Sequence, residues 1–248
     1  MAEASFAPCA VIPVYDHEQP LPHVVGALRN AGLPCVLVDD GSHASCAAVM
    51  DELARQPQVE LLRLPSNQGK GAAVAAGLRE AARLGHSHAL QVDADGQHDL
   101  STLETFIDTA RQYPQAVICG YPEYDASVPK GRLYARYLTH VWVWINCLSL
   151  QIRDSMCGFR IYPLAQTLAV LDSCRIGQRM DFDTEILVRM AWREQPMHWL
   201  PTRVHYPEDG LSHFRLWHDN VLISGMHARL FFGMLVRAPR IIWRRLVA

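Results

Sequence analysis

Hydrophobic residues along this chain fall alternately into short continuous runs and longer stretches of helical periodicity. The continuous runs are rich in Val, Ile and Leu, as buried strands are, and cover 9–14, 35–38, 59–64, 88–92 and 116–119. Helical periodicity covers 20–31, 46–55, 69–84 and 100–111. Four repeats of a strand followed by a helix predict an α/β fold, in which a mostly parallel sheet carries helices on both faces.

The regular alternation stops after Tyr121. We assign the rest of the chain to a loop at 121–130, a long amphipathic helix at 131–150, two helices at 166–171 and 181–193, and a strand at 197–204. From Arg215 the pattern is helical, with arginines on an apolar background. The predicted organisation is one α/β domain over residues 1–214, followed by a basic segment of amphipathic helices over 215–248.

Polar loops directly follow four of the predicted strands. They occupy 13–18, 39–42, 66–71 and 93–98. Parallel strands bring their carboxyl ends to one edge of the sheet, which is where ligands of such folds bind. We therefore expect these four loops to line one site.

The loop after the fourth strand, Asp93-Ala94-Asp95-Gly96-Gln97-His98, carries the most specific chemistry. Two carboxylates one residue apart can converge on a cation if the backbone turns there, and oxygen ligands suit Mg2+ or Mn2+. Gln97 could add a neutral oxygen. An isolated Asp-x-Asp is more often a solvated turn, but its position at a strand end favours a metal ion that neutralises a diphosphate.

Two neighbouring loops carry groups suited to a nucleotide. Gly69-Lys70-Gly71 opens a helix, where backbone N–H groups and the Lys70 ammonium could bind a phosphate, although a flexible helix entry is an equal alternative. Asp39 and Asp40 could accept hydrogen bonds from a base or ribose, or could only form a turn. The spacing matches neither the phosphate-binding loop of ATPases nor the glycine pattern of dehydrogenases.

Five short motifs, taken in order, resemble glycosyltransferase family 2. They are Pro13-Val14-Tyr15, Val38-Asp39-Asp40-Gly41-Ser42, Asn67-Gln68-Gly69-Lys70-Gly71-Ala72, Asp93 to His98, and Cys157-Gly158-Phe159-Arg160. Within the family, the chain most resembles the polyprenol-phosphate (dolichol-phosphate) mannosyl- or glucosyltransferase group. The similarity extends from about residue 10 to residue 213, and the combination is far more specific than any one motif.

The resemblance implies a GT-A (Rossmann-like) fold and inverting transfer of a hexosyl group from a GDP- or UDP-sugar to a lipid acceptor such as a polyprenyl phosphate. The implied metal ligands are Asp93, Asp95 and Gln97, and the implied catalytic residues are Asp93, Asp95 and Arg160. The expected donor-binding residues are Pro13, Tyr15, Glu18, Asp39, Asp40, Lys70, Asp93, Ala94 and Asp95. The expected acceptor-binding residues are Arg132, Arg136, Ser155, Arg160, Ser212 and His213, since arginine pairs well with phosphate oxygens.

Two departures from the family pattern leave donor preference open. The chain has Asp16 where the family usually has Asn, and Gly96 where it usually has Leu. Members of the polyprenol group can carry C-terminal transmembrane helices, whereas this chain ends in an arginine-rich segment. We expect that segment to make a peripheral membrane contact or, as an equal alternative, to pack on its own domain.

Other functions remain as alternatives. If the acceptor is a hydroxyl of a glycolipid or cell-envelope glycan, Asp183 or Glu185 is the candidate general base, although both could simply form an acidic first turn of a helix. A non-catalytic module that binds a nucleotide-sugar or a lipid is a second alternative, and the intact Asp93 and Asp95 argue against it. A nucleotidyltransferase would normally have a basic, Gly-rich first loop, which 13–18 is not.

The composition and the charge distribution indicate where in the cell the protein is expected. The net charge is -2, but residues 211–248 contain six arginines and one acid, so the basic groups gather at the C-terminus. The seven cysteines show no zinc spacing and predict reduced thiols. We find no secretory signal and judge the apolar stretches 133–150 and 221–247 too interrupted to span a membrane. The expected location is cytoplasmic, with contact at the inner face of the membrane and no nucleic-acid partner.

Overall fold

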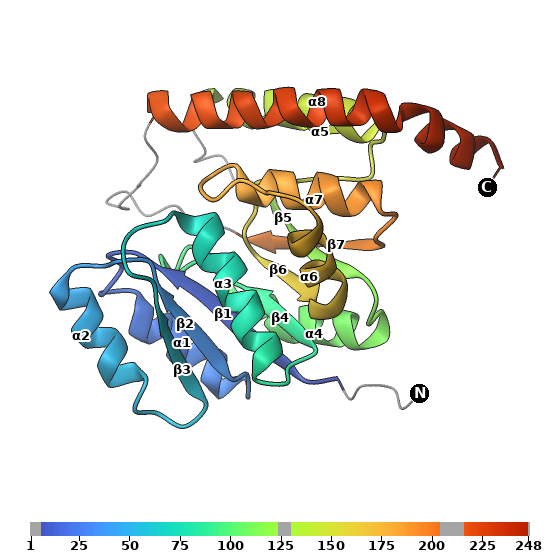
Figure 1. The fold of residues 1–248 in the computed structure, drawn as a ribbon. Helices are drawn as coiled ribbons and strands as arrows, with labels where there is room; N and C mark the ends of the chain where they lie inside the picture. The colour runs from blue at the N-terminus through green and yellow to red at the C-terminus, as the bar shows by residue number, and fades with distance from the viewer. Residues whose placement is uncertain (1–5, 124–129, 204–215, 248) are drawn as a thin grey trace.

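A seven-stranded sheet forms the centre of the protein (Figure 1). The computed structural model describes residues 6–123, 130–203 and 216–247, with the side chains of 130–135, 216 and 245 outside that description. The strands are β1 (Pro8–Val14), β2 (Cys35–Asp39), β3 (Val59–Arg63), β4 (His88–Gln91), β5 (Val117–Glu123), β6 (Arg160–Pro163) and β7 (Met197–Arg203). They lie in the order β3-β2-β1-β4-β6-β5-β7.

All strand pairs in the sheet are parallel except those of β6. β1 pairs in parallel with β2 and β4, β2 with β3, and β5 with β7. β6 runs antiparallel to both β4 and β5. The predicted mostly parallel α/β fold is therefore confirmed. β6 was not predicted, because Arg160-Ile161-Tyr162-Pro163 contains a single aliphatic residue and gives no apolar run.

Helices cover both faces of this sheet. They are α1 (Leu21–Asn30), α2 (Ala44–Leu53), α3 (Lys70–Arg83), a short 3-10 helix η1 (Leu100–Thr102), α4 (Leu103–Gln112), α5 (Lys130–Cys147), α6 (Leu164–Ser173), α7 (Phe182–Trp192) and α8 (Leu216–Val247). Alternate residues of a strand point to opposite faces. In β1, Ala10 and Ile12 pack with α1, α2 and α4, whereas Cys9 and Val11 pack with α3, α6 and α7.

Helix α3 lies unusually close to the sheet. A Cβ atom at Gly77 would lie 2.4 Å from Cγ1 of Val11 and 2.9 Å from Cγ2 of Val38, so only glycine permits this approach. The contact fixes α3 against β1 and β2. Its first residue, Lys70, is thereby held at the edge where those strands end.

Helices α5 and α8 lie side by side and form an outer layer over α7 (Figure 1). Met226 and Leu230 of α8 are fully buried and join the core beneath. α8 is one continuous helix of 32 residues that contains Pro239, rather than several helices. The division at residue 214 stays a prediction.

One helix in the described part of the chain is long and apolar enough to cross a membrane, judged by length and composition alone. It covers Trp217–Arg244 of α8, and 22% of its most apolar window is buried in the protein. The expectation that residues 221–247 are too interrupted by charge to span a membrane is too strict by that criterion. Length and composition do not distinguish a spanning helix from one lying on a surface.

All seven cysteines lie in the described residues and are thiols, and six of them are buried. Burial raises the pKa of Cys9 and Cys35 to about 12, so neither forms a thiolate at neutral pH. This agrees with the predicted reduced state.

Candidate active site

A small cavity lies at the carboxyl edge of the sheet, beside the end of β4. Its volume is about 110 Å³. It is lined by Asp93, Asp95, Gln97, His98, Pro122, Arg136, Met156, Cys157 and Gly158. The loop after β4 thus meets the segment before β6 and one face of α5. The predicted metal ligands Asp93, Asp95 and Gln97 are brought together here.

The loop after β4 turns back on itself so that its polar side chains share this cavity. Oδ1 of Asp95 accepts a hydrogen bond from the backbone N–H of Gln97 at 3.0 Å. Gly96 has φ of +70°, a left-handed conformation that favours glycine. Ala94 between the two carboxylates is buried and anchors the loop in the core.

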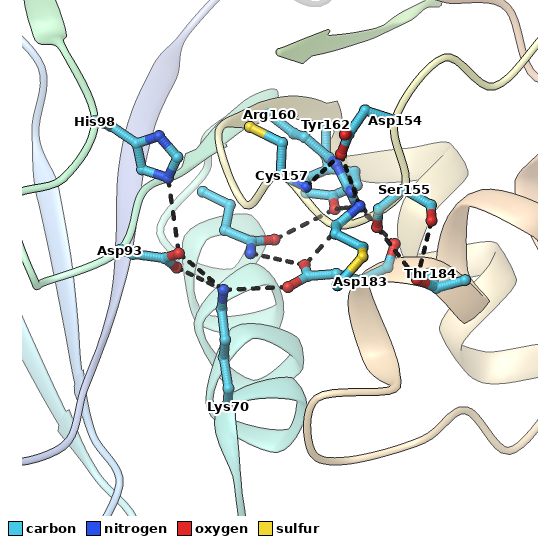
Figure 2. Close-up of polar contacts among 12 residues, drawn as sticks. Lys70, Asp93, His98, Asp154, Ser155, Cys157, Arg160, Tyr162, Asp183 and Thr184 are labelled. Carbon is cyan, nitrogen blue, oxygen red and sulfur yellow. Dashed lines mark hydrogen bonds and ion pairs between the residues drawn. The ribbon is translucent and has the colours of Figure 1, made fainter. Parts of the chain in front are cut away.

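The Lys70 ammonium lies between two carboxylates (Figure 2). Its Nζ is 2.7 Å from Oδ1 and 2.9 Å from Oδ2 of Asp93, and 3.1 Å from Oδ2 of Asp183. Burial alone would lower the pKa of Lys70, but attraction to Asp183 and Asp93 outweighs it and raises that pKa. Burial would likewise raise the pKa of Asp93, yet Lys70 and then His98 hold it well below its usual value. Both groups are therefore charged at neutral pH.

The backbone at the start of α3 is already engaged within the protein. Asp40 accepts hydrogen bonds from the N–H groups of Gln68 at 2.6 Å and Gly69 at 2.8 Å. The N–H of Ala72 donates to the carbonyl of Gln178 at 2.9 Å. The expectation that Gly69-Lys70-Gly71 presents open N–H groups to a phosphate is wrong for Gly69, and it stays a prediction for the amides of Lys70 and Gly71. The Lys70 side chain is what this loop contributes to the site.

Asp39 and Asp40 are both buried and hold loops in place. Asp39 accepts from the backbone N–H of Ser42 at 2.8 Å and from Nε of Arg63 at 3.1 Å. Burial raises the pKa of Asp40, an effect that the N–H groups of Gln68 and Gly69 partly oppose. In this structure the turn-forming alternative describes both residues, and their role at the nucleotide stays a prediction.

The remaining expected donor residues lie at the end of β1. Pro13 is buried, whereas Tyr15 and Glu18 are partly exposed. Asp16 between them accepts hydrogen bonds from His43, at 2.7 Å from both the backbone N–H and Nδ1. This loop is thus tied to the one after β2, as the parallel topology predicts.

Arg160 is fully buried, with an exposed fraction of 0%. Nη2 donates to the carbonyl of Ser155 at 2.7 Å, and Nη1 donates to the carbonyl of Asp183 at 2.7 Å and to the Tyr162 hydroxyl at 3.3 Å (Figure 2). The guanidinium is not among the groups lining the cavity. It braces the segment before β6 against the start of α7, and its expected contact with an acceptor stays a prediction.

Arg136 is the expected acceptor residue that does line the cavity. Its Nη2 and Nε lie 2.6 and 2.7 Å from Oδ2 of Asp154. Oδ1 of Asp154 accepts from the N–H groups of Met156 and Cys157, both at 2.8 Å. Burial would raise the pKa of Asp154, but His140 and Arg136 hold it well below its usual range. A charged carboxylate therefore fixes the arginine beside the cavity.

The other expected acceptor residues either do not line the cavity or lie outside the described part of the chain. Ser155 is fully buried, and its hydroxyl lies 3.1 Å from that of Thr184. Arg132 lies on α5 with its side chain outside the described part, and Ser212 and His213 fall outside the described residues. Their roles stay predictions.

The sequence did not indicate that Asp154 forms an ion pair with Arg136. It also did not indicate that Asp93 and Asp183 both form ion pairs with Lys70. An acid three residues before a Cys-Gly-Phe-Arg motif was the available signal for Asp154. The candidate base Asp183 is held by Lys70 and by Gln91, whose Nε2 donates to Oδ1 at 2.9 Å. The other candidate base, Glu185, is fully buried and held by Arg189 and Arg229. Neither lines the cavity.

The side chains at the cavity fit a divalent ion that is shared with a phosphate ligand. Within the described residues, no group of three or more His, Cys, Asp or Glu side chains is arranged to hold a metal by itself. Mg2+ sites typically use one or two carboxylates, with waters and substrate phosphates completing the shell. Oδ1 of Asp93 is buried and, apart from the Lys70 ammonium at 2.7 Å, has no hydrogen-bond partner within the described residues. Asp93, Asp95 and Gln97 match such a partial set of oxygen ligands.

Comparison with known proteins assigns the chain to a family. A family model described as glycosyl transferase family 2 matches residues 9–170, which is more than half of the chain. The chain belongs to this family. The predicted family is therefore confirmed, and the protein is a glycosyltransferase by membership.

Two curated relatives of this family 2 glycosyltransferase are similar to it over about three fifths of its length. Polyprenol monophosphomannose synthase of Mycolicibacterium smegmatis is 30% identical over 167 residues, covering 61% of this chain and 60% of that protein. Dolichyl-phosphate beta-glucosyltransferase of Dictyostelium discoideum is 29% identical over 164 residues, covering 61% of this chain and 49% of that protein. The chain therefore matches about half to three fifths of the length of these relatives.

A solved structure has the same fold. Glucosyl-3-phosphoglycerate synthase from Mycobacterium tuberculosis, in complex with Mn2+ and uridine-diphosphate-glucose, superposes with a TM-score of 0.63 at 14% identity. The superposition covers 94% of this glycosyltransferase and 79% of that chain. The predicted GT-A-like architecture is thereby confirmed.

Proposed function

We propose that this glycosyltransferase moves a hexosyl group from a GDP- or UDP-sugar to a polyprenyl phosphate, with inversion at the anomeric carbon and a divalent cation at Asp93 and Asp95. The observation that carries the proposal is the composition of one cavity, which has Asp93, Asp95 and Gln97 facing the fixed arginine Arg136. The names of the relatives, a polyprenol monophosphomannose synthase and a dolichyl-phosphate glucosyltransferase, support the acceptor class.

The donor half of the site would be the acidic side of the cavity. A divalent cation held by Asp93, Asp95 and Gln97 would neutralise the charge that develops on the leaving diphosphate. Lys70 adds a second positive charge beside Asp93. Pro13, Tyr15, Glu18, Asp39, Asp40 and Ala94 remain donor-binding candidates. The complex of the structural neighbour with Mn2+ and uridine-diphosphate-glucose supports a metal-bound nucleotide-sugar.

The acceptor half would be the basic side of the cavity. Arg136 presents a guanidinium whose geometry suits phosphate oxygens. A phosphate is already anionic and needs no general base, whereas a hydroxyl must lose a proton. The carboxylates among the lining residues are Asp93 and Asp95, both assigned to the cation. This favours a lipid phosphate over a glycan hydroxyl. Arg132, Ser155, Arg160, Ser212 and His213 remain acceptor candidates.

The outer layer of α5 and α8 would rest on the membrane that holds the acceptor. Tyr137 and Leu138 directly follow Arg136 in α5 and are 61% and 60% exposed. Large exposed apolar side chains continue along α8 at Trp217, Val221, Phe232, Leu235, Val236, Ile242 and Trp243. Arg237, Arg240 and Arg244 lie among them, as in helices bound to anionic lipid surfaces. The proposed location is the inner face of the cytoplasmic membrane.

A transfer assay tests this proposal. The purified protein is incubated with GDP- or UDP-hexoses and with either polyprenyl phosphate or the matching polyprenol. Each reaction is run with Mn2+ and with a chelator. The variant Asp95→Asn is compared with the control Asp108→Asn, which changes an exposed carboxylate on α4. We expect transfer to the phosphate only, dependent on Mn2+, at least a hundredfold weaker in Asp95→Asn and unchanged in Asp108→Asn. Transfer to the alcohol only, or full activity in chelator, would overturn the proposal.

A further inference from the structure

The Lys70 ammonium occupies the part of Asp93 that a metal ion would use. Nζ lies within 2.9 Å of both carboxylate oxygens. A divalent ion that binds Asp93 must therefore displace the ammonium or share the carboxylate with it, and two cations at such distances repel each other strongly. The Lys70 ammonium therefore competes with the cation for the Asp93 carboxylate.

The structure also contains a second place for the ammonium. Oδ2 of Asp183 lies 3.1 Å from Nζ, and Asp183 is not among the residues that line the cavity. Asp183 is held rigidly, because its Oδ1 accepts from Nε2 of Gln91 at 2.9 Å and its backbone carbonyl accepts from Arg160 at 2.7 Å. Its position does not depend on whether Lys70 contacts Asp93.

Gly158 closes the space beside this ion pair. A Cβ atom there would lie 2.9 Å from Oδ2 of Asp93 and 3.0 Å from Nζ of Lys70. The backbone of the segment before β6 therefore packs directly on the pair. With that side covered, Asp183 is the charged partner within reach when the ammonium leaves Asp93.

We infer that Asp183 is a positioning residue that retains Lys70 when a divalent cation takes Asp93. In the metal-free protein both carboxylates share the ammonium. With the cation bound, Asp183 alone holds it, so Lys70 stays beside the site and faces the donor diphosphate instead of competing for Asp93. This rests on the proposed cation site at Asp93 and Asp95, and it assigns Asp183 a role other than that of a general base.

A double-mutant cycle on Mn2+ affinity tests the inference without any turnover. Bound Mn2+ is measured by electron paramagnetic resonance, without donor, for the wild type, Lys70→Met, Asp183→Asn and the double variant. We expect Lys70→Met to tighten binding at least fivefold and Asp183→Asn to weaken it at least fivefold. In the Lys70→Met background, Asp183→Asn should change affinity less than twofold, because the residue that it positions is gone.

Equal weakening by Asp183→Asn in both backgrounds would overturn the inference, since Asp183 would then act on the ion through its own charge. Asp172→Asn, an exposed carboxylate paired with Arg79, is the matched control and should leave affinity unchanged. Melting curves of each variant confirm folding. If Asp93→Asn and the wild type bind Mn2+ equally, or no variant binds it with or without GDP or UDP, the proposed cation site fails and the inference with it.

Discussion

Gln91, the last residue of β4, is the register partner of Arg160, the first residue of the antiparallel strand β6. Their side chains meet through Tyr162, whose hydroxyl donates to Oε1 of Gln91 at 3.3 Å and accepts from Arg160 at the same distance. Because β6 runs against its neighbours, the segment that precedes it reaches the edge where parallel strands end. A motif located before a strand thereby joins loops located after strands.

Gly158→Ala should damage the site more than the fold. The added methyl would lie about 3 Å from atoms of both Asp93 and Lys70, in a space already closely packed. We expect transfer activity to fall at least tenfold and the free energy of unfolding to fall by about 1–3 kcal/mol. Activity assays and urea unfolding measure the two effects. Gly26→Ala, where nothing lies within 4 Å, is the control and should keep full activity.

Glu185→Gln should destabilise the protein without removing a catalytic base. Glu185 is fully buried and accepts from Arg189 at 2.6 Å, from Arg229 at 3.1 Å and from the N–H of Gly177 at 2.9 Å. Loss of its charge removes the buried carboxylate that the two arginines share, which costs about 3 kcal/mol, although Arg229 keeps Asp181 at 3.7 Å. Urea unfolding should show this loss, with turnover per folded molecule unchanged.

The exposed pair Arg55–Glu52 provides the control for this prediction. Its side chains are largely in water, so Glu52→Gln should change the free energy of unfolding by less than about 1 kcal/mol. A Glu185→Gln variant of normal stability but with a large loss of turnover would instead favour the general-base role.

Stability should fall as the pH drops below about 6.5, because of His227. Burial lowers the pKa of His227 to about 4, and Nδ1 accepts a hydrogen bond from Asn146 of α5 at 3.2 Å. The unfolded chain, with an ordinary histidine pKa near 6.5, binds more protons than the folded protein between about pH 4 and 6.5. Stability is therefore fully present above about 6.5 and lost progressively toward 4.

From pH 7 to 5 we expect a loss on the order of 1 kcal/mol, after allowance for solvent screening. Urea unfolding at a series of pH values measures it. His227→Gln should remove this part of the slope, whereas His23→Gln, at an exposed position on α1, should not. An identical slope in wild type and His227→Gln would contradict the assignment.

The exposed face of α8 should be required for binding to anionic liposomes. Phe232, Val236 and Trp243 are largely exposed, and their combined replacement by serine removes apolar area without touching the buried Met226 and Leu230. We expect the wild type to float with phosphatidylglycerol vesicles and the triple variant to stay in solution. Tyr113→Ser, at an exposed aromatic residue after α4, is the control.

A different result would identify another occupant of that face. If the wild type does not float but forms a dimer that the triple variant lacks, the face binds a second copy of the chain. Equal flotation of wild type and variant would discard the proposed contact through α8. Sedimentation together with flotation distinguishes these outcomes.

Much of the fold follows from local pattern. The five buried runs became strands within a few residues of their expected bounds, because a central parallel strand must be apolar on both faces. The loop from Asp93 to His98 was predicted as the acidic part of the site because polar residues at the carboxyl end of such a strand lie outside the core, at the edge where ligands bind. Family membership could likewise be read from the order of the motifs.

Local pattern was insufficient where a residue's role depends on a distant partner. β6 has too few aliphatic residues to show a strand pattern, and its pairing with β4 comes from chain topology. Asp39, Asp40 and Arg160 carry the charges expected of binding residues, and the sequence did not show that they are also buried and hydrogen-bonded to Ser42, Gly69 and Ser155. Burial of a polar group is decided by what packs over it.

The sequence by itself determined the strands other than β6, the family and the acidic loop, since periodicity and motif order are properties of neighbouring residues. Only the tertiary structure decided that Lys70 lies between Asp93 and Asp183, that Asp154 holds Arg136 at the cavity, and that α8 lies beside α5. These contacts join segments from 18 to more than 100 residues apart. Their formation depends on the path of the whole chain, because hydrogen bonds and ion pairs require atoms to meet within about 3 Å.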